Sequence, residues 1–194
     1  MIRLKPAQEF TIALLLMALM VATRFHHFGS VTHLPDASWA IFIAGGFFLR
    51  RMSLFLVFMG LAVLIDFLAI TRFGVSSFCI SPAYGFLLPA YAALWLGGRW
   101  LQAHYQPEWK MLFQLTAMVI VSAAAAFLIS SGSFYLLSGN IGETSITGFM
   151  AQTVKYFPGF LLTTAGYVAA MTATFILVRL ASGAGDQHHP THHA

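Results

Sequence analysis

Hydrophobic residues in this chain are gathered into six runs, which are separated by short polar connections. The runs cover approximately residues 10–23, 37–49, 52–70, 83–96, 111–137 and 156–180. A helix that crosses a bilayer needs ~20 mostly apolar residues. The last two runs are long enough, whereas the first, second and fourth are short and must include flanking residues, tilt, or lie partly behind neighbouring helices. The pattern predicts an all-α integral membrane protein with six transmembrane helices.

The composition is typical of a protein embedded in a lipid bilayer. Only 8% of the 194 residues are charged and 59% are hydrophobic, and the mean hydropathy is +0.79. Soluble domains carry about 25% charged residues. We expect one membrane domain over residues 1–181, because the length leaves room for no other. Residues 182–194, which include four histidines, should form a disordered cytoplasmic tail.

Lysine and arginine residues divide unequally between the two sides that six spans create. One side holds Arg3, Lys5, Arg50, Arg51, Arg99, Lys110 and Arg179, and the other holds Arg24, Arg72 and Lys155. Basic residues are in excess in cytoplasmic loops. We therefore expect a multi-pass membrane protein with both termini in the cytoplasm. A nucleic-acid partner is not expected, because the basic residues are scattered singly or in pairs.

On this topology three connections rich in polar side chains face the outside, and together they could form the rim of an outward-facing pocket. They cover Arg24–Asp36, Thr71–Pro82 and Ser138–Lys155. The first contains His26 and His27, which are candidate ligand-binding residues. The alternative is that these histidines simply lie at the membrane interface.

Cys79 is the only cysteine, so an intramolecular disulfide is excluded. It lies between Phe78 and Ile80, in a segment interrupted by Gly74 and Pro82. A free cysteine usually behaves as a small buried hydrophobic residue. A loop thiolate is also a soft donor, able to supply one axial ligand to a metal whose other positions are filled by a macrocycle. The residues alone leave both interpretations open.

Two further residues are candidates for a ligand site. Asp66 lies near the outer end of the third run, and an ionisable residue at membrane depth indicates a functional site by default. The alternative is a structural ion pair with Arg72 or Arg24. Tyr84 begins the fourth run, and its amphipathic ring suits the membrane interface or a flat ligand equally well.

Taken together, these features resemble the S-components of energy-coupling-factor (ECF) vitamin transporters. These are six-span membrane proteins of about this size that carry no ATPase, and the chain contains no P-loop. The stretch Phe78-Cys79-Ile80-Ser81-Pro82-Ala83-Tyr84, with Asp66 before it and His26-His27 after the first run, is similar to the BtuM family of small bacterial cobalamin transporters.

The resemblance implies binding of cobalamin (vitamin B12) in an outward-facing cavity and its uptake across the bacterial cytoplasmic membrane. Cys79 would ligate cobalt in place of the nucleotide base, and Asp66, Tyr84 and His27 would line or support the cavity. His26 and Phe78 are further ligand-binding candidates. The resemblance also implies removal of the cyano group from cyanocobalamin by the Cys79 thiolate. Partners would be the corrinoid, the lipid bilayer and an ECF energising module.

S-components usually dock on the energising module through small residues of the first helix, but here Ala18 and Ala22 lie toward its outer half. The sequence therefore leaves dependence on an ECF module open.

Alternatives to cobalamin uptake remain at this stage. The chain could instead carry a different vitamin, with Cys79 only structural. It could also be a membrane enzyme with Cys79 as nucleophile and a nearby histidine as base, or an assembly subunit without a ligand.

Overall fold

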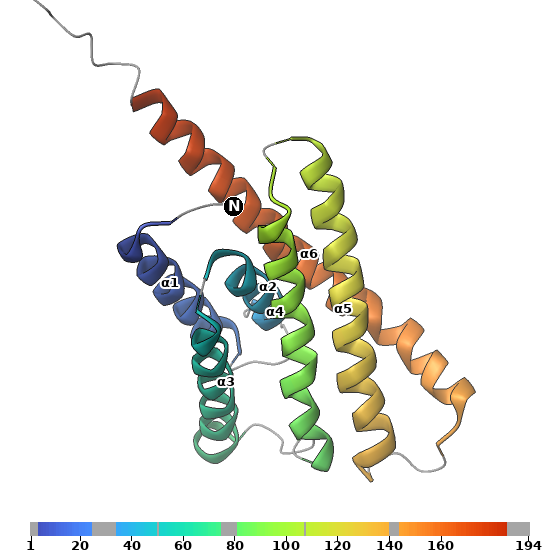
Figure 1. Ribbon diagram of the computed structural model, residues 1–194. Coiled ribbons are helices and arrows are strands. Elements are labelled where there is room, and N and C mark those ends of the chain that lie inside the picture. Colours follow the sequence, from blue (N-terminus) through green and yellow to red (C-terminus); the bar gives the residue numbers. More distant parts are fainter. Residues whose placement is uncertain are drawn as a thin grey trace, which may run out of the picture.

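The computed structural model describes residues 4–24, 34–49, 51–74, 81–106, 108–139 and 144–185. Every regular element in these ranges is helical (Figure 1). The elements are α1 (Pro6–Arg24), α2 (Ser38–Phe48), α3 (Met52–Phe73), η2 (Pro82–Phe86), α4 (Leu87–Ala103), α5 (Lys110–Leu137) and α6 (Ile146–Gly185). The six α-helices follow the six hydrophobic runs in order, so the prediction of an all-α fold is confirmed.

Four of these helices, α1, α3, α5 and α6, are long and apolar enough to cross a membrane. The other two are shorter, with 11 residues in α2 and 17 in α4. At a rise of 1.5 Å per residue, α2 reaches only about half of the ~30 Å hydrocarbon core. The structure is therefore that of a helical membrane protein, while the count of six spans stays a prediction.

The boundaries of α6 differ most from the expected ones. The helix begins at Ile146, ten residues before the expected start of the last span, so most of the third polar connection is helical. Phe149, Met150 and Val154 follow Ile146 at helical spacing and extend the apolar face. The helix continues to Gly185, so residues 182–185 of the expected disordered tail are helical. Residues 186–194 lie outside the described part of the chain.

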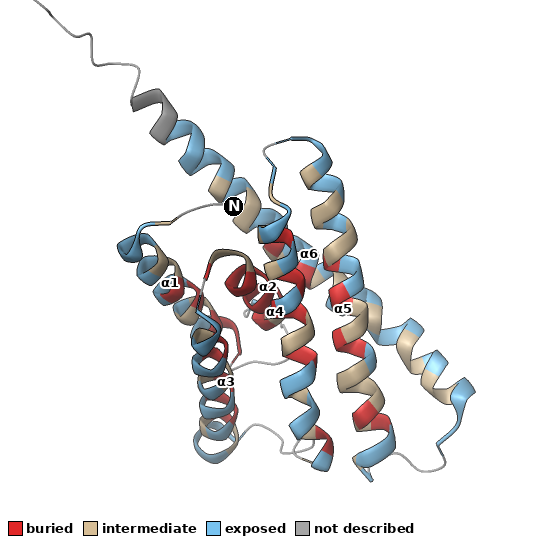
Figure 2. Ribbon diagram, in the orientation of Figure 1, coloured by how far each residue is buried: buried red, intermediate tan, exposed pale blue. Residues whose placement is uncertain are grey.

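The short helix α2 lies at the centre of the bundle, where Figure 2 shows most of its residues and the adjoining part of α4 as buried. Its Phe42 stacks on Tyr91 of α4, with ring centroids 4.4 Å apart. A Cβ atom added at Gly46 would fall on the Trp95 carbonyl, and one added at Gly98 would fall on the Ile43 carbonyl. The two helix backbones touch because glycine occupies both positions.

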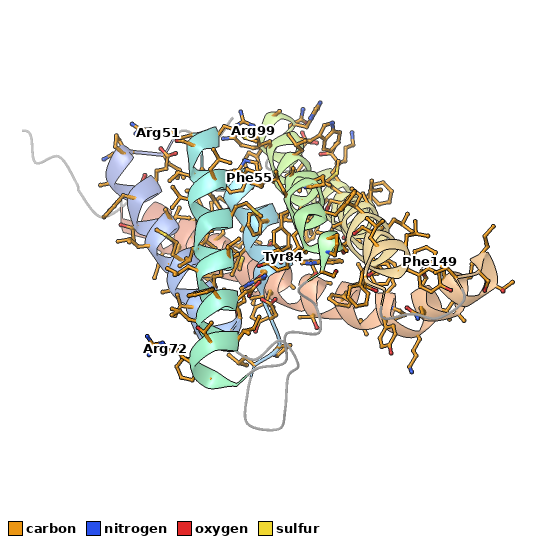
Figure 3. The ribbon with its side chains drawn as sticks, turned by 90° about the horizontal axis from the view of Figure 1, so that it is seen from below. Arg51, Phe55, Arg72, Tyr84, Arg99 and Phe149 are labelled. Carbon is orange, nitrogen blue, oxygen red and sulfur yellow. The ribbon has the colours of Figure 1, made fainter. Side chains whose placement is uncertain are left out.

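Basic residues lie at both ends of the bundle. Figure 3 shows Arg51 and Arg99 at one end and Arg72 at the other. Lys110 begins α5 at the Arg51–Arg99 end, in agreement with the grouping used for the topology argument. Which end faces the cytoplasm stays a prediction.

Candidate functional site

A buried ion pair joins the last residue of α1 to the second half of α3. Arg24 Nε donates to Asp66 Oδ1 at 2.8 Å, and Arg24 Nη2 donates to Asp66 Oδ2 at 2.8 Å. The Arg24 and Asp66 side chains are only 3% and 5% exposed. A bidentate pair of this kind satisfies the planar guanidinium and the carboxylate at the same time. Of the alternatives for Asp66, the structure shows the ion pair with Arg24.

The remaining nitrogen of Arg24 gathers three more side chains. Its Nη1 donates to the Tyr91 hydroxyl at 2.7 Å and to Ser38 Oγ at 2.8 Å. Asp36 is also in reach, at 3.4 Å from the same nitrogen. The Asp36 carboxylate accepts from the Ser38 hydroxyl at 2.6 Å and from the Ser38 backbone N–H at 2.9 Å. Arg24 therefore connects α1 to the start of α2, to α3 and to α4.

Tyr84 of η2 joins this network from the side of the α3–η2 connection. Its hydroxyl donates to Asp66 Oδ2 at 2.6 Å, so a single carboxylate oxygen accepts from both Arg24 and Tyr84. Pro82 starts η2, and the fixed φ of proline suits the first position of a helical turn. This short turn places the Tyr84 ring next to the end of α3.

A cavity of about 260 Å³ adjoins the network. Arg24, Tyr84 and Tyr91 supply its polar groups, and Met59, Leu87 and Leu88 are among its apolar lining residues. Asp66 is not one of the lining residues, so it acts behind the cavity wall by holding Arg24 and Tyr84. We call Arg24, Asp36, Ser38, Asp66, Tyr84 and Tyr91 the Arg24 network.

Two of the site residues expected from the sequence, Asp66 and Tyr84, are thus in direct contact. The other four, Cys79, Phe78, His26 and His27, lie outside the described residues. Cys79 belongs to the segment 75–80, which connects Gly74 at the end of α3 to Ser81 at the start of η2. Both ends of that segment adjoin elements of the Arg24 network.

Tyr91 and Ser38 were not identified from the sequence. A signal for Tyr91 exists, because it follows Tyr84 by seven residues, a spacing that returns to the same face of a helix. Ser38 offers no comparable signal, because serine and aspartate are both typical of any helix start. The central place of Arg24 follows only from the packing of four elements around it.

Comparison with known proteins gives no match: no family model matches the chain, and no curated protein matches it.

Proposed function

We propose that this protein binds cobalamin and carries it across the cytoplasmic membrane of a bacterium, as an S-component similar to the BtuM family. The observation that carries the proposal is the direct contact between Asp66 and Tyr84 beside a cavity. The resemblance to the BtuM family assigns both residues to one ligand site, and the segment with Cys79 connects the two elements that hold them.

The chemistry of the proposal rests on Cys79. Its thiolate donates an electron pair to trivalent cobalt and takes the axial position of the nucleotide base, and the metal in turn stabilises the thiolate against protonation. The added electron density weakens the bond to the opposite axial ligand. In cyanocobalamin, the cobalt–carbon bond then breaks, cyanide leaves with the electron pair, water fills the position, and the cobalt stays trivalent.

The Arg24 network has a supporting role in this proposal. Tyr84, held by Asp66, lines the cavity with its ring, which suits the flat face of a corrin. The 260 Å³ cavity is smaller than the about 300–1,000 Å³ typical of pockets for drug-sized ligands. A bound corrinoid therefore requires more space, extending toward the connections that contain His26, His27, Phe78 and Cys79.

The visible absorption spectrum of the protein purified after growth with cyanocobalamin tests the proposal. We expect bands shifted from those of the free vitamin, and loss of cyanide over time. Cys79→Ser should fold but lose both the shift and the conversion, whereas Ser77→Ala in the same segment should retain both. A Cys79→Ser protein with the wild-type spectrum would assign the cobalt ligand elsewhere, with His26 or His27 as the next residues to replace.

A colourless wild-type protein would favour the alternatives. The chain would then be an S-component for a different vitamin, with Cys79 structural, or a membrane thiol enzyme. Vitamin uptake by intact cells separates these two, because only the first accumulates a vitamin.

Dependence on an ECF module is a separate part of the proposal. Ala18 and Ala22 lie exposed on α1, away from the core, and small residues permit close helix contact. We expect Ala18→Leu/Ala22→Leu to leave corrinoid binding unchanged and to lower uptake if a module docks there. Undiminished uptake by this variant, in cells with and without the module, would exclude docking at this face.

A further inference from the structure

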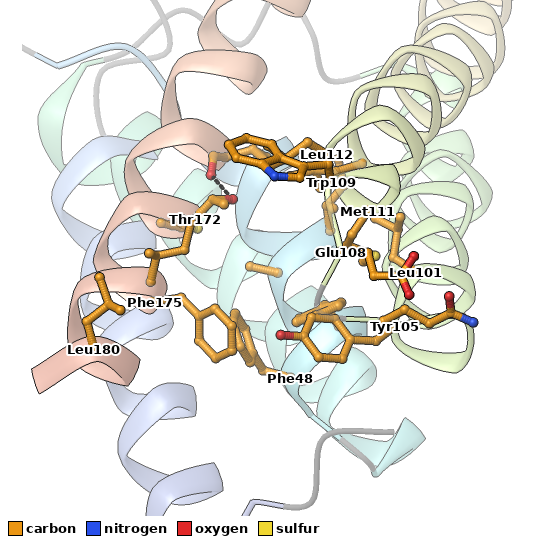
Figure 4. A pocket seen from close by; sticks show the side chains of 18 residues that line it. Phe48, Leu101, Tyr105, Glu108, Trp109, Met111, Leu112, Thr172, Phe175 and Leu180 are labelled. Atoms are coloured by element: carbon orange, nitrogen blue, oxygen red, sulfur yellow. Dashed lines mark hydrogen bonds between the residues drawn. The ribbon is translucent and has the colours of Figure 1, made fainter. Parts of the chain in front are cut away.

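A second and larger cavity lies at the opposite end of the bundle from the Arg24 network. Its volume is about 510 Å³, and it is enclosed by the end of α2, the α4–α5 connection, the start of α5 and the second half of α6 (Figure 4). Its lining residues on α4 and beyond begin two residues after Arg99, so the cavity lies at the end of the bundle where Arg99 and Arg51 lie. We call it the α5–α6 cavity.

The lining of the α5–α6 cavity is apolar in its depth and aromatic at its edge. The Phe48 and Phe175 rings lie 5.5 Å apart, and the Tyr105 and Phe175 rings 6.5 Å apart. Trp109 forms another part of the lining, yet 86% of its surface is exposed. Exposed tryptophan and tyrosine beside apolar surface are typical of the membrane–water interface.

One cation contacts this aromatic edge, and a second lies next to it along the chain. The Arg179 guanidinium carbon lies 5.3 Å from the centroid of the Phe175 ring, which lines the cavity. Lys110 is not a lining residue, but both of its neighbours in the chain, Trp109 and Met111, line the cavity. Across the ranges that the structure describes, neither Arg179 nor Lys110 forms an ion pair. Glu108 is the one carboxylate among the lining residues.

We propose that the α5–α6 cavity binds one anionic phospholipid, with an acyl chain in the apolar interior and the phosphate headgroup at Arg179 and Lys110. Basic pockets between transmembrane helices on the cytoplasmic side bind anionic headgroups. The cavity also has a volume in the range of small-molecule pockets. Lipid acyl chains are the most abundant apolar groups in a bilayer. The two cations favour a lipid with an anionic headgroup.

Native mass spectrometry of the full-length protein tests the proposal, after release from nanodiscs that contain equal amounts of phosphatidylglycerol and phosphatidylcholine with identical acyl chains. We expect one retained lipid, predominantly phosphatidylglycerol. Each of Arg179→Gln and Lys110→Gln should lower the preference by about fivefold, the effect of one basic residue near a membrane surface. Lys155→Gln, near the other end of α6, is the matched control and should leave the preference unchanged. Glu108→Gln should increase it.

The acyl-chain part of the proposal needs a variant that fills the cavity. Ile176→Trp places a large side chain in the lining, whereas Leu177→Trp adds the same side chain to the neighbouring residue outside it. Only the first should lose the lipid, and thermal unfolding shows whether both fold. If Ile176→Trp does not fold, Thr172→Leu, a smaller change in the same lining, replaces it.

A second measurement does not depend on any filling variant. Phosphatidylglycerol brominated on its acyl chains should quench wild-type tryptophan fluorescence more than Trp109→Phe fluorescence. Three results would each overturn the proposal. They are equal retention of the two lipids, equal lipid loss in Ile176→Trp and Leu177→Trp, and dimers in place of bound lipid.

Discussion

Arg24 and Asp66, forty-two residues apart in the chain, form two parallel N–H···O bonds of 2.8 Å inside the bundle. Burying two charges carries a desolvation cost that only good geometry and additional hydrogen bonds offset. Both are present, because Tyr84 also donates to Asp66 and because Ser38 accepts from Arg24 while Tyr91 is within hydrogen-bonding distance of it. The pair fixes the end of α1 relative to the second half of α3 at the wall of the candidate site.

Replacing one partner of this pair should destabilise the protein strongly. For Asp66→Ala we expect a loss of about 3–5 kcal/mol, because the buried Arg24 loses its bidentate carboxylate and keeps only the longer contact of 3.4 Å to Asp36. The double variant Arg24→Gln/Asp66→Asn should lose less than the sum of the two single variants. Thermal unfolding in detergent measures both effects. Arg72→Gln is the control, because Arg72 is an exposed cation in the last turn of α3. A loss of stability in Arg72→Gln as large as that in Asp66→Ala would contradict the assignment of Arg24 as the partner of Asp66.

The hydroxyl of Tyr84 should contribute measurably to stability and to ligand binding. Tyr84→Phe removes one hydrogen bond to a carboxylate, and such bonds contribute about 1.5–3 kcal/mol. Tyr167→Phe is the matched control, because its hydroxyl donates to the neutral backbone oxygen of Pro35 at 2.8 Å and a neutral bond contributes about 0.5–1.5 kcal/mol. Chemical denaturation and corrinoid titration of both variants test the ranking. Equal losses would mean that the Asp66 carboxylate accepts no charge-assisted bond from Tyr84.

The contact between α2 and α4 should not tolerate a single added methyl group. Gly98→Ala places a Cβ on the Ile43 carbonyl, and overpacking of this kind costs about 1–3 kcal/mol. Gly60→Ala on α3 is the control, because its added Cβ meets nothing within 4 Å and alanine is the better helix former. Thermal unfolding should therefore shift in opposite directions in the two variants. A neutral Gly98→Ala would show that the two backbones can separate freely.

The orientation of the chain can be tested with its single cysteine. We expect a membrane-impermeant thiol reagent to label Cys79 in intact cells without ligand, because the excess of basic residues places the other end in the cytoplasm. In a Cys79→Ser background, Glu108→Cys at the other end should react only after the membrane is opened. The reverse pattern would invert the topology.

The sequence predicted the helices well and the site only in part. Apolar runs determine helices in a bilayer, because every backbone group must be paired within its own segment, so even the short α2 was located to within one residue at each end. The Asp66–Tyr84 contact brings together residues 18 positions apart across a connection. The sequence suggested Asp66 because a carboxylate is unusual at membrane depth, and Tyr84 because its ring suits a flat ligand as well as the interface.

What the sequence could not provide is the choice of partner. Arg24 and Arg72 were both candidates for the ion pair with Asp66, since each follows a hydrophobic run on the side of the membrane near which Asp66 lies. Packing decides between them, because Arg24 lies in the contact of four elements while Arg72 is in the exposed last turn of α3. The α5–α6 cavity was also not predicted, since its lining comes from four separate parts of the chain.

The enclosed position of α2 has a consequence for how the chain is assembled during synthesis. α2 is too short to stand alone in lipid, and the helix it packs against most closely, α4, follows only after α3 has been made. Chains are synthesised at about 5–20 residues per second, so several seconds pass between the synthesis of α2 and that of α4. During this time α2 can pack only against α1 and α3. Premature termination anywhere between α3 and Trp95 would leave a glycine surface without its cover, which a membrane quality-control protease could recognise.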